Sequence, residues 1–149
     1  MKLVEDGRRV MRGQISTGTY NGSENRLQLF DGLFTTGYKI ISFKIAPSNP
    51  LNAQEFMATL STEADSGIAD WDWQSNTQVG WAGFGFNGAS YTEPWDLIDE
   101  DAIIVDDLFI SSYTTGTSPI DLNYYIVIEK YSFNDWVGAL NMVRNRSQA

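Results

Sequence analysis

The chain has 149 residues, of which 42% are hydrophobic and 13% aromatic, and its ten bases and nineteen acids give a net charge of −9. This length and composition predict a single domain with a sizeable core. The chain contains no histidine and no cysteine, which removes the commonest general base, the thiolate nucleophile and the usual zinc ligands. We therefore expect a soluble protein that is not an enzyme and binds no cofactor.

Charge is segregated along the sequence. Residues 1–44 hold seven bases and four acids, residues 45–129 hold fourteen acids and no base, and residues 130–149 hold three bases and one acid. An acidic surface repels phosphate backbones and anionic membranes and favours a basic partner. We expect neither nucleic acid nor a membrane as a partner. The first residues lack the apolar core of a signal peptide, and no apolar run is long enough for a membrane span.

The first 25 residues are predicted to form an N-terminal arm and a first hairpin, with the hairpin turn at Asn21-Gly22. Residues 26–149 are predicted to form the main β-sandwich domain. Arginines gather in both net-basic ends of the chain, where they can dock a protein partner. The predicted docking residues are Arg8, Arg9, Arg12, Arg144 and Arg146.

Alternation of apolar and polar residues predicts β-strands through most of the chain. In segment 38–46, Ile41, Phe43 and Ile45 are expected on the core face and Ser42 and Lys44 on the opposite face. Further strands are predicted in segments 54–62, 79–86, 101–113 and 123–132. Asp106-Asp107 should form a corner or bulge within segment 101–113.

Turn residues separate the predicted strands. Asn21-Gly22, Asp31-Gly32 and Asn87-Gly88 are typical of tight hairpins. All four prolines are expected between strands, at positions 47, 50, 94 and 119. Short strands separated by such turns predict an all-β fold, namely a single antiparallel β-sandwich or jelly-roll-like domain.

One short C-terminal helix is predicted over residues 133–144. Its apolar residues form one stripe that faces the sheet, and they are Phe133, Trp136, Val137, Leu140 and Val143. Ser132 suits the N-cap, and Arg144 and Arg146 suit the last turn. Gly138 weakens the helix, so we expect it to depend on packing against the sheet.

Two groups of acidic residues are candidates for a functional site, one catalytic and one calcium-binding. Asp70 and Asp72 flank a tryptophan and could form a glycosidase pair, although an acidic loop over buried tryptophans explains the same pattern. The candidate calcium ligands are Asp99, Asp101, Asp106 and Asp107, but their spacing is not that of an EF-hand, and solvated charge at a sheet edge is the alternative.

Several segments, in order, resemble small virion-associated structural proteins encoded by tailed phages of marine and freshwater bacteria. They include Asp31-Gly-Leu-Phe-Thr-Thr-Gly-Tyr-Lys-Ile40, Asp70-Trp-Asp-Trp73, Ile98-Asp-Glu-Asp-Ala-Ile-Ile104, Asn123-Tyr-Tyr-Ile-Val-Ile-Glu129 and residues 143–148. The resemblance covers most of residues 26–148 and leaves residues 1–25 unmatched. It implies a non-enzymatic capsid decoration or cement subunit that assembles in the host bacterial cytoplasm. The implied location is the capsid surface, and the implied partners are further copies of the chain and the major capsid protein.

The alternative from another functional class is a carbohydrate-binding or adhesion module. Exposed tryptophans stack on sugars, and the candidates are Trp71, Trp73, Trp81 and Trp95. At least two coplanar exposed rings would favour this alternative, whereas a hydrolase would require Asp70 and Asp72 in one cleft.

Overall fold

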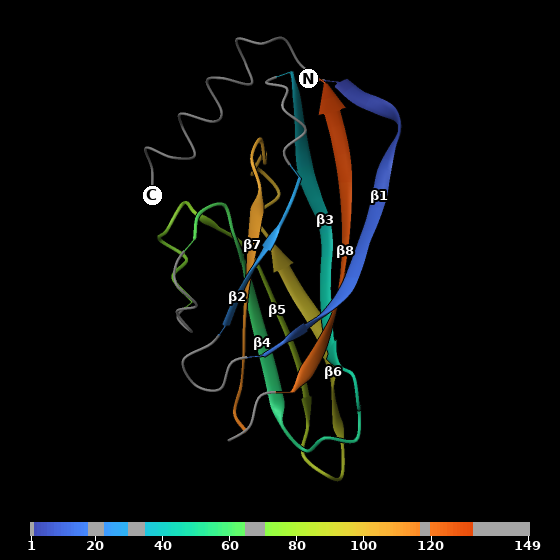
Figure 1. Cartoon of the computed structure of the whole chain (residues 1–149), viewed down its shortest axis with the longest axis vertical. Helices are drawn as coiled ribbons and strands as arrows, with labels where there is room; N and C mark the ends of the chain where they lie inside the picture. Colours follow the sequence, from blue (N-terminus) through green and yellow to red (C-terminus); the bar gives the residue numbers. More distant parts are fainter. Residues whose placement is uncertain (1, 18–22, 30–34, 65–70, 117–119, 133–149) are drawn as a thin grey trace.

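The computed structural model describes residues 2–17, 23–29, 35–64, 71–116 and 120–132, which form two antiparallel sheets packed face to face (Figure 1). Sheet A has the order β1 (Lys2–Ser16), β8 (Asp121–Ser132), β3 (Thr36–Pro47). Sheet B has the order β2 (Ser23–Leu27), β7 (Leu108–Thr114), β4 (Glu55–Ser61), β5 (Gln78–Phe86), β6 (Tyr91–Ile98). The predicted all-β antiparallel sandwich is confirmed.

The core lies between the sheets, because alternate residues of each strand point inward. Sheet A contributes Phe43, Ile45, Ile126 and Ile128, and sheet B contributes Phe56, Leu60, Ala82 and Ile110, all of them buried. Within the described residues, no helix is long and apolar enough to cross a membrane.

Four of the predicted strands are confirmed, as β3, β4, β5 and β8. The predicted strand 101–113 is only partly confirmed, since β7 begins at Leu108. The corner at Asp106-Asp107 precedes it. Before that corner, Ile104 pairs with Tyr38 of β3 as an isolated bridge, with two backbone N–H···O distances of 2.8 Å.

The expectation that every proline lies between strands is wrong. Pro47 is the last residue of β3, and Pro94 lies within β6. Both strands are at the edge of their sheets, where one side of the strand needs no ladder hydrogen bonds, so a missing N–H is tolerated. Because Pro94 interrupts the alternation of residues in β6, the sequence pattern did not predict this strand.

The core position predicted for Ile41 is also wrong. The register between β3 and β8 shifts between Ile40 and Ser42, so Ile41 occupies a bulge and is 40% exposed. A bulge adds one residue to a strand and reverses which face the following residues occupy. Ile40 and Phe43 therefore both point into the core, which a strict period of two does not allow.

One of the three predicted hairpins lies within the described residues, and it is confirmed. Asn87-Gly88 joins β5 to β6, and Gly88 has φ of 91°, as a tight turn requires. Asn21-Gly22 and Asp31-Gly32 lie outside the described residues, and the strands on either side of each pair belong to different sheets.

The N-terminal segment contributes an edge strand to sheet A. β1 extends along β8 from Lys2 to Ser16, with a register shift between Leu3 and Arg8. Residues 133–149 lie outside the described residues, and with them lie the predicted helix 133–144, Trp136, Arg144 and Arg146. The helix and the domain boundary at residue 25 remain predictions.

Candidate functional site

The outer face of sheet A, defined here as the side chains of β1, β8 and β3 that point away from sheet B, combines basic and aromatic groups. The strand register builds it in rows. One row consists of Arg8, Glu129 and Lys39, and another of Arg12, Tyr125 and Lys44. Val10, Val127 and Ser42 lie between these rows.

This face remains largely exposed in the described part of the chain. Tyr125 is 45% exposed, and Arg8, Val10 and Arg12 are exposed as well. An open groove of about 800 Å³ crosses it, lined by Arg12, Gln14, Lys44, Pro94, Asn123 and Tyr125 among others. Apolar surface framed by charged groups is typical of a protein-docking surface.

Neither Arg8 nor Arg12 forms an ion pair with a described side chain. The acid in their face, Glu129, instead accepts a hydrogen bond of 2.8 Å from the Tyr131 hydroxyl. This hydrogen bond to Glu129, followed by desolvation and the carboxylate's charge, raises the pKa of Tyr131 above its ordinary value. Lys39 lies over the same Tyr131 ring, 5.8 Å from its centroid.

Asp96 of β6 joins the edges of the two sheets at one side of this face. Its carboxylate accepts a hydrogen bond of 2.8 Å from the Phe43 backbone N–H and one of 2.7 Å from Lys44 Nζ. The backbone bond occupies a donor on the edge of β3 that no strand of sheet A pairs. β3 is thus covered by β6, whereas β1 forms the other edge of sheet A.

The basic and acidic stretches of the sequence lie on different sheets, with most described bases on sheet A and most described acids of segment 45–129 on sheet B and its loops. Seven of the eight described lysines and arginines lie on sheet A, namely Lys2, Arg8, Arg9, Arg12, Lys39, Lys44 and Lys130. Most described acids of segment 45–129 lie on sheet B and its loops, and the exposed ones include Glu55, Asp72, Glu93, Asp99, Glu100 and Asp101. The molecule therefore presents surfaces of opposite charge.

The three arginines predicted to dock do not share one face. Arg8 and Arg12 point outward from sheet A, whereas Arg9 occupies the opposite face of β1, across from Ile128 of the core. All three are exposed because β1 is an edge strand. A strand separates neighbours onto opposite faces, so Arg9 serves as a natural control for the other two.

The four described tryptophans form two edge-to-face pairs over β5 and β6. Trp71 meets Trp95 with centroids 5.2 Å apart at 75°, and Trp73 meets Trp81 at 6.0 Å and 66°. Trp81 is buried, and its indole N–H donates to Gln78 Oε1 at 3.1 Å. Trp73 and Trp95 are 67% and 37% exposed, but neither pair offers the coplanar platform expected of a stacking site.

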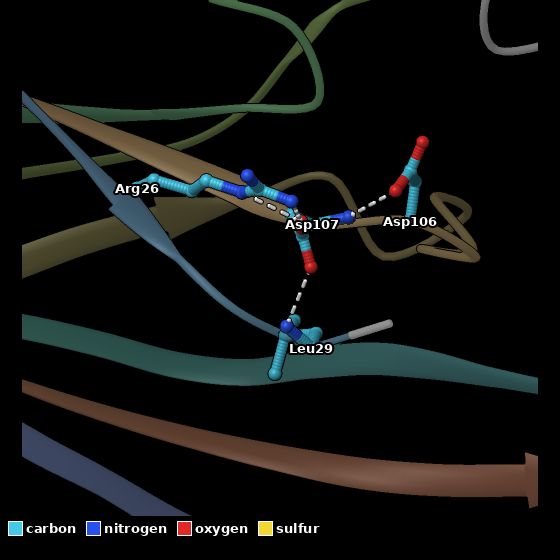
Figure 2. A network of polar contacts seen from close by, with 4 residues as sticks. All are labelled: Arg26, Leu29, Asp106 and Asp107. Carbon is cyan, nitrogen blue, oxygen red and sulfur yellow. Dashed lines mark hydrogen bonds and ion pairs between the residues drawn. The ribbon is translucent and has the colours of Figure 1, made fainter. Parts of the chain in front are cut away.

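The predicted acid candidates serve local structure. Figure 2 shows Asp107, which is buried, accepting from Arg26 Nε at 2.7 Å and from the Leu29 backbone N–H at 2.8 Å. Arg26 Nη2 also donates to it. Asp106 accepts from the Asp107 N–H at 2.9 Å.

Asp99 accepts from the Asp101 N–H at 3.0 Å. Across the described residues, no three acidic or other metal-ligating side chains converge on one point. Asp70 lies outside the described residues, so the Asp70/Asp72 pair remains a prediction. The exposed Asp72 carboxylate accepts from the Gln74 N–H at 3.0 Å.

Sequence reasoning missed Lys39, Lys44, Tyr125 and Tyr131 as parts of the site. They come from β3 and β8, which are far from Arg8 and Arg12 in the sequence, and only the register of sheet A brings them together. The outward positions of the two strands alternate these residues with Ser42, Val127 and Glu129, so neither strand on its own carried a clear signal of a shared surface.

No protein-family model matches the chain, and no curated protein matches it. Among solved structures it is similar to VP1 of Trichodysplasia spinulosa-associated polyomavirus, with a TM-score of 0.48 and 12% identity, over 87% of this chain and 97% of that one. A protein of Desmodium yellow mottle tymovirus gives a TM-score of 0.39 and 11% identity, over 87% and 90%. Both neighbours are viral proteins, but scores and identities this low carry no conclusion about function.

Proposed function

We propose that this chain is a non-enzymatic structural subunit of a tailed-phage virion that decorates or cements the capsid. The observation that carries the proposal is the outer face of sheet A, where Arg8, Arg12 and Tyr125 are exposed beside a groove. The ordered resemblance of residues 26–148 to small virion-associated proteins supports the same function. The absence of histidine and cysteine agrees with it.

Charge complementarity gives this face two kinds of partner. An acidic surface of the major capsid protein fits it, and so does the acidic surface of sheet B on a second copy, which would build a homo-oligomer. Complementary charges set register and partner choice more than affinity. Contacts between exposed charges weaken with salt, since screening acts over about 8–10 Å at physiological ionic strength.

Co-sedimentation with phage heads that lack the protein tests this function. We expect Arg8→Ser/Arg12→Ser to reduce occupancy and to make the remaining occupancy less sensitive to salt, because fewer charge contacts are left to screen. The melting temperature should be unchanged because both side chains are exposed. Arg9→Ser is the control, because it makes the same type of substitution, with the loss of one positive charge, on the other face of the same strand. Wild-type occupancy of the double variant would refute docking through this face.

The carbohydrate-binding module is the competing function, and Trp73 and Trp95 are its most exposed rings. A chain that never associates with heads, but whose tryptophan fluorescence is quenched by a glycan, would replace the structural function with this one. The edge-to-face packing of both ring pairs argues against it.

A further inference from the structure

β1 offers, over residues 8–15, a strand edge that no other described strand pairs. Among the described strands it pairs with β8 alone, in a continuous register from Arg8 to Ser16. No backbone hydrogen bond joins residues 8–15 to any other described segment. In an antiparallel ladder, backbone N–H and C=O groups alternate between the two sides of a strand. About half of the groups in this stretch therefore face away from β8, where another strand can pair with them.

The side chains along this edge select the charge of such a strand. Arg8, Val10 and Arg12 alternate on the outer face, and Arg9 lies on the other. A second copy of β1 paired antiparallel about Val10 would set Arg8 against Arg12, and like charges on adjacent strands are destabilising. An extended segment with acids opposite Arg8 and Arg12 would instead form favourable cross-strand pairs.

We infer that β1 binds an extended acidic segment of a partner protein by strand addition, which enlarges sheet A by one strand. The inference rests on the proposed function, for which it supplies the mode of attachment. Backbone hydrogen bonds would hold the segment, and acids on its outer face would contact Arg8 and Arg12 with an apolar residue beside Val10.

The test uses the full chain and capped synthetic peptides, with backbone amide NMR as the readout. The probe is Thr-Glu-Thr-Val-Thr-Glu-Thr. The first control, Thr-Glu-Pro-Val-Pro-Glu-Thr, keeps the charge but lacks two N–H donors. The second, Thr-Lys-Thr-Val-Thr-Lys-Thr, keeps the strand propensity but reverses the charge. We expect only the probe to slow hydrogen exchange, and only at alternate amides within residues 8–15.

The arginine variants then test the contribution of charge. Arg8→Ser/Arg12→Ser should weaken probe binding by about 2- to 30-fold, as expected for two exposed charge contacts. Arg8→Lys/Arg12→Lys should retain most of it, and Arg9→Ser should change it by about 2-fold or less. Retained amide spectra of the free variants establish that they are folded.

Three results would overturn strand addition: equal binding of the proline peptide, unchanged β1 amide exchange in the bound state, or no binding of the probe. Head association without probe binding refutes strand addition and leaves the virion function standing. Probe binding without head association refutes the virion function and leaves the edge site standing.

Discussion

The buried Asp107 should be the most sensitive charged position in the described part of the fold. Its side chain is 4% exposed, whereas that of Arg26 is 62% exposed. Asp107→Ala removes the acceptor of the buried Leu29 N–H, which costs about 1–3 kcal/mol. It also removes a charge-assisted hydrogen bond to Arg26, which contributes about 1.5–3 kcal/mol. Relief from desolvation of the carboxylate offsets part of this, so we expect a net loss of about 2–4 kcal/mol.

Urea unfolding followed by tryptophan fluorescence measures this loss. With an m-value of about 2 kcal/mol/M, the midpoint should fall by about 1–2 M while the slope stays constant. Asp107→Asn should cost less, because its amide oxygen can still accept from Leu29. Glu93→Ala, at an exposed position, should stay within about 0.5 kcal/mol of the wild type.

A double-mutant cycle measures the interaction free energy between Arg26 and Asp107. Arg26→Ala combined with Asp107→Ala should show a coupling of about 1–3 kcal/mol, because the two side chains interact directly. Additive effects, or an Asp107→Ala variant as stable as the Glu93→Ala control, would refute the reasoning.

The Tyr131 hydroxyl should ionise above its ordinary pKa. The stability linked to it should therefore be intact below pH about 10 and be lost as the pH rises through the higher pKa of the folded state. Absorbance titration should show that the pKa of Tyr131 falls in Glu129→Gln. In Gly83→Ala, the new Cβ would lie 2.5 Å from Trp95 Nε1, so thermal unfolding should report a loss of about 1–3 kcal/mol that a smaller residue at Trp95 relieves. Trp136→Ala should cost about 3–5 kcal/mol in the same assay if the predicted C-terminal helix packs on the sheet, and a loss below 1 kcal/mol (about the surface value) would refute that packing.

The sequence predicted the fold class and the strands whose apolar residues alternate, because burial of one face imposes period two. β6 was not predicted because Pro94 interrupts its pattern. An edge strand tolerates a proline, which would remove a ladder hydrogen bond from an inner strand. Ile41 was misplaced because a one-residue bulge has no clear local signature. The described strands that flank Asn21-Gly22 and Asp31-Gly32 belong to different sheets, and turn residues alone do not reveal which sheet the next strand joins.

The candidate site was predicted only in part. Arg8 and Arg12 were identified from their proximity in the sequence, but their separation from Arg9 follows from the strand conformation of β1. Lys39, Lys44 and Tyr125 joined them through pairings between distant segments, and such register depends on the whole sheet. Local patterns identify the chemistry of a strand, and only topology identifies its neighbours.

The central position of β8 in sheet A also constrains when the protein can fold during synthesis. β1 and β3 are both bonded to β8 and not to each other, yet β8 follows every other strand in the chain. A ribosome therefore releases all five strands of sheet B before sheet A can close over them. Until then the apolar face of sheet B lacks the cover of β8, and such exposed intermediates are prone to aggregate. Slowing translation across residues 121–132 should lengthen that interval and lower the yield of folded protein.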